Sequence, residues 1–176
     1  MTQRKRTGGA GISVVLDTGA ILAGIDLAGD SRYYITPLAF AELINPNARL
    51  KAEIAASEGS LSISAPDPTW IEEVGKTTAR LGESEALSPA DVETLALALQ
   101  LRSEDETLIL ATDDYAVQNT ANALNIKFRP ITEQGIKKQL TWTYICTGCR
   151  REYDKAQPHC EDCGNIVKRR VKRPPR

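Results

Sequence analysis

The chain has 176 residues, of which 41% are hydrophobic and 26% charged, enough for one ordinary domain with a buried core and a small appendage. No apolar stretch approaches the roughly 18 residues that a membrane span needs. The basic, Gly-rich start (1–11) is not followed by the apolar core of a signal peptide. We therefore expect a cytoplasmic protein, with no membrane attachment, whose thiols stay reduced.

The net charge of −1 hides a division of the chain into two parts. Nine of the 22 Lys/Arg residues but four of the 23 Asp/Glu residues lie from Tyr144 onward, so this end carries about +5 and the preceding body about −6. An acidic body holds nucleic acid poorly by charge alone, whereas a basic appendage can bind it.

Strand-like and helix-like segments alternate along the body. β-branched or apolar runs predict strands at 12–16, 33–36, 61–64, 107–111 and 126–128. N-cap residues, prolines at first helical positions and helical spacing of apolar residues predict helices at 20–28, 38–44, 48–57, 66–81, from 88 onward, and 115–124. This alternation predicts an α/β fold with a parallel sheet flanked by helices over 12–130. Residues 131–142 are expected to form a linker, 143–167 a zinc ribbon and 168–176 a basic tail.

Four acidic residues lie near the carboxyl ends of predicted strands or at the starts of the helices that follow. They are Asp17, Glu42, Asp91 and Asp114. Ligands of open parallel sheets bind beyond the carboxyl ends of the strands, so these carboxylates could share one site. Clustered carboxylates repel one another unless a cation neutralises them, and oxygen ligands suit Mg²⁺ or Mn²⁺.

Each acidic residue also has a structural explanation. Ser88-x-x-Asp91 fits a capping box, Asp17 fits an N-cap, and Asp113 and Asp114 can complement a helix dipole. Glu42 can simply face solvent. The pattern alone leaves the metal site and these structural roles open.

The residues that the chain lacks restrict its chemistry. Its one histidine, His159, lies among the cysteines, so the body has no Ser–His or Cys–His nucleophile, and no phosphate-binding glycine motif is present. If the body is catalytic, metal-activated water is the nucleophile that remains.

Four cysteines near the C-terminus form two C-x-x-C pairs, Cys146/Cys149 and Cys160/Cys163. This spacing is typical of a zinc ribbon, in which two knuckles share one tetrahedral Zn²⁺. A disulfide is disfavoured in a reduced compartment, and the spacing does not match ferredoxin clusters. Such a small module depends on zinc for its folding, so we expect the body and the ribbon to fold as separate units.

Basic residues surround the cysteines and are predicted to contact RNA phosphates. They are Arg150, Arg151, Lys155, Lys168, Arg169 and Arg170. A tail that only improves solubility is the alternative. Tyr144 and Tyr153 could stack on bases or could equally form the core of the ribbon, whereas Trp70 and Trp142 are expected to be packing residues.

Several short motifs resemble a known family. Val14–Ala20, Ala41–Leu43, Ser88–Asp91 and Leu110–Asp114 look like the successive acidic motifs of PIN-domain nucleases. Asp114–Asn119, followed by a four-cysteine ribbon, is similar to the archaeal form of the Nob family of ribosome-maturation endonucleases. The resemblance covers about residues 12–172.

The resemblance implies a PIN fold and a function. By it, Asp17, Glu42, Asp91 and Asp114 are the catalytic, metal-binding positions, and Thr112 orients a carboxylate or water. It also implies cleavage of a single-stranded region of precursor small-subunit ribosomal RNA, within the pre-ribosomal particle, to form the mature 3′ end. Two alternatives remain: a toxin-type PIN ribonuclease acting on tRNA or mRNA, and a non-catalytic RNA-binding assembly factor.

Overall fold

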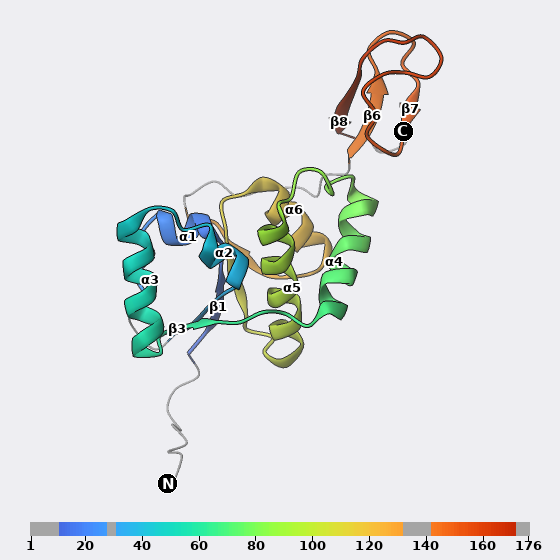
Figure 1. Cartoon of the computed structure of the whole chain (residues 1–176). Helices are drawn as coiled ribbons and strands as arrows, with labels where there is room; N and C mark the ends of the chain where they lie inside the picture. Colours follow the sequence, from blue (N-terminus) through green and yellow to red (C-terminus); the bar gives the residue numbers. More distant parts are fainter. Residues whose placement is uncertain (1–10, 28–30, 132–141, 172–176) are drawn as a thin grey trace.

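The computed structural model describes residues 11–27, 31–131 and 142–171 and shows a mixed α/β body joined to a small β-module (Figure 1). The body contains a five-stranded parallel sheet with the strand order β3-β2-β1-β4-β5. Its strands are β1 (Ser13–Leu16), β2 (Arg32–Ile35), β3 (Leu61–Ile63), β4 (Ile109–Ala111) and β5 (Phe128–Arg129). The expected parallel α/β fold is confirmed.

The helices begin where the sequence supplies caps. Proline occupies a first helical position in four of them, where its missing N–H costs no hydrogen bond. The helices are α1 (Thr18–Leu22), α2 (Pro37–Ala41), α3 (Pro46–Glu58), α4 (Pro68–Leu81), α5 (Pro89–Glu104) and α6 (Tyr115–Ala123).

The two faces of the sheet are covered by different helices. Val15 and Leu110 point to a core shared with α4, α5 and α6, whereas Leu16 and Ile35 point to a core shared with α1, α2 and α3. This division follows from the alternation of side chains along a strand. Figure 1 shows the two helix groups on either side of the sheet. The sheet is therefore covered on both faces, and Asp17 follows directly at the carboxyl end of its central strand β1.

The C-terminal module is a three-stranded antiparallel sheet with the order β7-β6-β8. Its strands are β6 (Trp142–Cys146), β7 (Glu152–Tyr153) and β8 (Val167–Val171). Tyr144 and Val167 pack with Cys146 and Cys160 in a small core, and Tyr153 lies against it. The two tyrosines therefore belong to the core of the ribbon.

Some sequence-based expectations differ from the structure, and one falls outside the described residues. The helix expected at 20–28 ends at Leu22, because Gly24 adopts a left-handed conformation with φ of 81°. Strand β8 continues to Val171, so Lys168, Arg169 and Arg170 lie in a paired strand and not in a loose tail. The linker expected at 131–142 falls largely outside the described residues.

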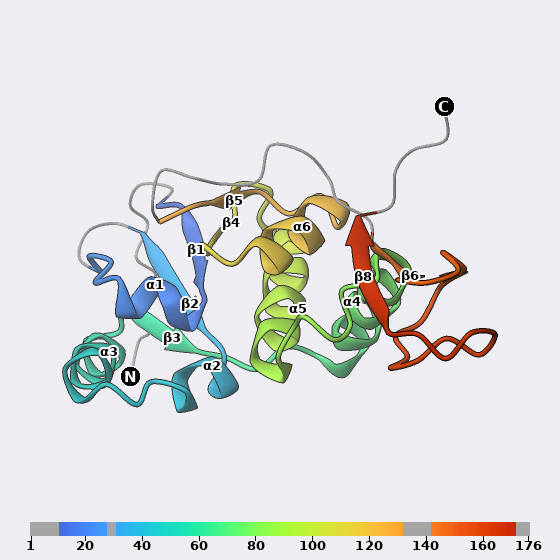
Figure 2. The same ribbon diagram turned by 90° about the horizontal axis from the view of Figure 1, so that it is seen from above.

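The ribbon lies against the body at the end of α4 (Figure 2). Gly82, which ends α4 with φ of 71°, lies so close to Trp142 that an added Cβ would stand 3.0 Å from its carbonyl oxygen. Only glycine combines this close approach with a left-handed backbone without strain. No sequence pattern predicts this contact between the two parts.

Candidate active site and zinc centre

Asp17 lies directly after β1, at the carboxyl edge of the sheet, and is buried, with 7% of its surface exposed. It is the N-cap of α1, and its Oδ1 accepts a hydrogen bond from the backbone N–H of Ala20 at 2.6 Å. Its own backbone N–H donates to the carbonyl oxygen of Ala111 in the neighbouring strand β4. The carboxylate is thus held between two central strands.

Glu42 is connected to this edge through Thr18. It is the C-cap residue of α2, and its Oε2 accepts a hydrogen bond from the hydroxyl of Thr18 at 3.0 Å. Thr18 follows Asp17 directly in the sequence, so this hydrogen bond places Glu42 near the same end of β1. Sequence reasoning did not single out Thr18, although its position beside Asp17 was the available signal.

Asp91 combines its two predicted roles. It is the third residue of α5 and forms the expected capping box with Ser88: its Oδ2 accepts from the Ser88 N–H at 2.8 Å, and its own N–H donates to Ser88 Oγ. Its charge nevertheless acts on Asp17, where it raises the pKa. The capping box therefore orients the Asp91 carboxylate and still leaves it close enough to Asp17 to raise the pKa of that residue.

Thr112 and the two aspartates after it lie between β4 and α6. Thr112 is buried; its hydroxyl accepts from the Asp114 N–H at 3.1 Å and is hydrogen-bonded to the Asp17 carboxylate. Asp114 is the N-cap of α6, with its Oδ1 accepting from Ala116 and Val117. Asp113 accepts from the backbone N–H of Ile131 at 2.9 Å. Thr112 therefore positions both predicted ligands beside it.

The electrostatics of this edge suit a cation. Burial raises the pKa of Asp17, and the negative charges of Asp91 and Asp113 add to the increase, whereas hydrogen bonds from Thr112 and Ala20 oppose it. A buried carboxylate beside two other carboxylates is destabilised in its ionised form, and a divalent cation would relieve that cost. The carboxylates are not gathered as tightly as the cysteines among the described residues.

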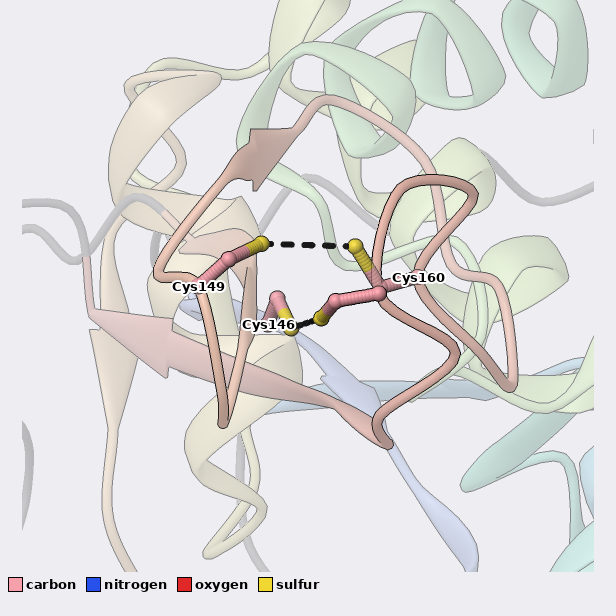
Figure 3. A group of neighbouring side chains, drawn as sticks. Cys146, Cys149 and Cys160 are labelled. Carbon is pink, nitrogen blue, oxygen red and sulfur yellow. Dashed lines mark hydrogen bonds between the residues drawn. The ribbon is translucent and has the colours of Figure 1, made fainter.

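The four cysteine sulfurs lie close enough together to bind one metal ion. All four Sγ atoms lie within 4.8 Å of one another. Cys146 and Cys163 are 3.3 Å apart and Cys149 and Cys160 are 3.5 Å apart, so each contact joins the two knuckles (Figure 3). Four sulfurs at about 2.3 Å from a central ion lie at nearly these separations, so the residues fit a tetrahedral structural Zn²⁺.

Polar neighbours favour the thiolate form of Cys160 and Cys163. The pKa of Cys149 is instead raised to about 12, because the backbone hydrogen bond from Arg151, which lowers it, is outweighed by hydrogen bonds with the other thiols and by desolvation. Hydrogen bonds from the side chain and backbone of Asn165 lower the pKa of Cys163 to about 6. The hydroxyl of Tyr153 donates to Cys160 Sγ at 3.1 Å and lowers the pKa of that thiol. Gly148 is required beside Asn165, because an added Cβ would stand 2.5 Å from its Nδ2. Outer hydrogen bonds of this kind orient metal ligands.

We expect the isolated full-length protein to carry one Zn²⁺ per chain and its removal to unfold the ribbon alone. The helices α1 to α6 all lie within residues 18–123, outside the cysteine module. Structural zinc supplies most of the folding free energy of such small modules. A strong chelator should therefore leave the far-UV helical signal largely intact while ribbon amides lose their dispersed NMR shifts. Collapse of the helical signal on chelation would contradict separate folding.

The predicted RNA-binding residues divide into two groups. Arg151 pairs with Asp162, and Arg169 pairs with Glu83 of the body, its side chain 32% exposed. All six residues are exposed, and the four that form no ion pair within the described part of the chain are Arg150, Lys155, Lys168 and Arg170. Lys168 and Arg170 flank Arg169 on β8, so they lie on the opposite face of the strand from it.

No helix of the described residues is long and apolar enough to cross a membrane.

Comparisons with known proteins agree with the two-part architecture. The PIN domain of ribonuclease, as a family model, matches residues 14–101. The chain is 36% identical over 159 residues to Endoribonuclease Nob1 of Pyrococcus abyssi, covering 89% of this chain and 92% of that protein. Endoribonuclease Nob1 of Methanothermobacter thermautotrophicus is 35% identical over 158 residues, covering 89% and 91%.

A second group of relatives matches less of the chain. Ribonuclease VapC1 of Thermoplasma acidophilum is 38% identical over 109 residues, which cover 62% of this chain and 54% of that protein. The Nob1 proteins of Pyrococcus abyssi and Methanothermobacter thermautotrophicus, in contrast, match over a length that must include part of the cysteine module. The chain is an endoribonuclease with a PIN domain, and it belongs to the Nob1 family.

Proposed function

We propose that this endoribonuclease cuts a single-stranded region of precursor small-subunit ribosomal RNA and so forms its mature 3′ end. The observation that carries the proposal is the joining of a PIN body to a four-cysteine module in one chain that resembles Nob1 proteins over 89% of its length. The similarity to Ribonuclease VapC1 spans a smaller part of the chain, 62%. We place this activity in the cytoplasm, on the pre-ribosomal particle.

In this proposal Asp17, Glu42, Asp91 and Asp114 hold the catalytic Mg²⁺ or Mn²⁺. When bound, such ions supply Lewis acidity and lower the pKa of water. The protein contributes the arrangement of the carboxylates. Backbone N–H groups fix Asp17 and Asp114 through one oxygen each, and Thr112 and Thr18 connect the neighbouring groups. Fixed ligands of this kind need no reorganisation when the phosphodiester arrives.

The proposed division of labour follows the charge pattern. The carboxylate site repels the RNA backbone, so the affinity must come from elsewhere, and we assign it to Arg150, Arg151, Lys155, Lys168, Arg169 and Arg170 around the zinc site. The exposed members Lys168 and Arg170 share one face of β8 and can reach a phosphate without breaking an ion pair.

The test is cleavage of a transcript that spans the 3′ boundary of precursor small-subunit RNA by the zinc-loaded protein with Mn²⁺. We expect one dominant cut at the mature end, mapped by primer extension. The same sequence annealed to a complementary strand should resist cleavage. A tRNA and an unrelated mRNA serve as competing substrates. Preferred cutting of the tRNA or mRNA, with no cut at the boundary, would favour the toxin-type function instead.

A further inference from the structure

Glu83 is a buried carboxylate that the acidic site does not use. It follows Gly82 at the end of α4, and 1% of its surface is exposed. Burying an ionised carboxylate is costly unless hydrogen-bond donors and positive charge compensate for the lost water. The hydrogen-bond donors around Glu83 therefore show which contact this residue stabilises.

Its three hydrogen-bond donors come from distant parts of the chain. Glu83 Oε1 accepts from Asn119 Nδ2 of α6 at 3.0 Å and from the indole N–H of Trp142 in β6. Its Oε2 accepts from the guanidinium of Arg169 in β8, which also lies over the Trp142 ring, 4.2 Å from the centroid. We call these four residues the Glu83 cluster. Two of its three donors belong to the ribbon.

Other contacts surround the Glu83 cluster and extend the interface. A Cβ added at Gly82 would lie 3.0 Å from the carbonyl oxygen of Trp142, so the backbones of the body and the ribbon approach each other closely here. Burial raises the pKa of Tyr144 on β6, and the charge of Glu85 adds to this increase. The ribbon thus meets the α4–α5 loop through packing, a stacked cation and hydrogen bonds, and not through a single surface ion pair.

The Glu83 cluster also leads back to the acidic edge. Asn119 lies on α6, the helix that Asp114 caps, and the neighbouring Gln118 donates to the carbonyl oxygen of Thr112 at 2.8 Å. The same short helix therefore carries a predicted metal ligand at its start and a ribbon-binding side chain near its end. Asp114–Asn119 is also the segment whose resemblance to the Nob family is most specific.

We propose that Glu83 fixes the orientation of the zinc ribbon on the nuclease body. Glu83 is then a positioning residue: it holds the exposed basic face of β8 at a set distance and direction from the carboxylate site. This part of the inference rests on the proposed function, because it assumes that one RNA contacts both places. An RNA bound along Lys168 and Arg170 would then present one phosphodiester to the site.

The docking itself is tested without RNA, in the full-length zinc-loaded protein. The variants are Glu83→Gln and Arg169→Met, which remove the ion pair from either side. The matched controls are Glu72→Gln, an exposed glutamate of α4, and Arg170→Met, the next residue of β8. ¹⁵N relaxation should give one common rotational correlation time for body and ribbon amides in the wild type and both controls. Both cluster variants should lose this common tumbling, with faster motion of the ribbon.

Arg169→Met changes no residue of the body but leaves the buried Glu83 carboxylate without its counter-ion. The double variant Glu83→Gln/Arg169→Met removes both charges, so it keeps the test decisive if either single variant is less stable, and it should lose the common tumbling as well. The indole N–H of Trp142 gives a second readout. Its exchange with solvent should become faster in both cluster variants, whereas that of Trp70 should not. Unchanged correlation times and unchanged Trp142 exchange in Arg169→Met would overturn the docking role of the cluster.

Two RNA substrates then test positioning. A short oligonucleotide that spans only the cut should be cleaved by Glu83→Gln at the wild-type rate, because the hydrogen bonds of Glu83 join it to Asn119, Trp142 and Arg169 and not to the proposed metal ligands. A long precursor should be cut by the same variant at several positions instead of one. Unchanged accuracy in an undocked variant would refute the positioning role. Absence of RNA cleavage in the wild type would count against the proposed function alone, since the relaxation result stands without it.

Discussion

Replacing Asp17 with asparagine should lower metal-dependent RNA cleavage by at least about 100-fold, because even an outer-shell partner of a metal site costs about 10–100-fold when it is lost, and Asp17 is proposed as a direct ligand. Its carboxylate lies between the two central strands of the sheet and is in contact with Thr112. The measurement is the single-turnover rate on one RNA over a range of Mn²⁺ concentrations.

The variant should nevertheless fold. Asparagine is as good an N-cap as aspartate, so the hydrogen bond from Ala20 survives. Burial raises the pKa of Asp17, so its contribution to folding is favourable below the unfolded pKa and is lost as the pH rises through the folded pKa. At pH 7 the metal-free variant should therefore be at least as stable as the metal-free wild type. Mn²⁺ should raise the melting temperature of the wild type more than that of the variant.

A matched control separates the site from the cap. Asp67 is the N-cap of α4, and its Oδ1 accepts a hydrogen bond from the backbone N–H of Thr69. It is not one of the four proposed metal ligands. Asp67→Asn makes the same chemical change at the same kind of position and should keep full activity. If Asp17→Asn cleaves RNA as fast as the wild type at every Mn²⁺ concentration, Asp17 is not a metal ligand.

The strand–helix junctions could be predicted because their signals are local. A β-branched run followed by Asp17 and Thr18 marks the end of β1 and the cap of α1 within a few residues. The end of α1 was mispredicted for an equally local reason: the apolar residues continue beyond Leu22, but Gly24 turns the backbone to positive φ. Asp91 could not be assigned from sequence, since the capping box and the acidic edge use the same side chain.

The contact between body and ribbon could not be predicted, because its partners are far apart in sequence. Glu83 lies 36 residues from Asn119, 59 from Trp142 and 86 from Arg169. No periodicity relates such positions, and a glutamate in a loop is ordinarily solvated. Strand β8 was missed for a similar reason: its charged residues show no apolar alternation, and it is a strand because β6 provides a partner from Trp142 to Cys146.

Removing three exposed charges of the ribbon should weaken RNA binding and flatten its salt dependence. The variant is the full-length triple substitution Lys155→Gln, Lys168→Gln and Arg170→Gln, which spares the cysteines and the ion pair of Arg169 with Glu83. Each phosphate contact on single-stranded RNA contributes about 0.7 to the slope of log K against log salt, so three contacts contribute about 2.

Such a slope change corresponds to a large effect at low salt. If the affinities of wild type and variant converge near 1 M salt, a slope difference of about 2 gives about 100-fold weaker binding at 0.1 M. The control replaces three exposed lysines of the body, Lys51, Lys76 and Lys127, with glutamine and removes the same net charge. Fluorescence anisotropy with one single-stranded RNA at several salt concentrations compares the three proteins. A body triple that loses as much affinity and slope as the ribbon triple would show that net charge alone, and not the face of the ribbon, holds the RNA. A ribbon triple with the wild-type slope would leave its basic residues as a solvated surface, because phosphate contacts cannot be lost without a change in the number of ions released.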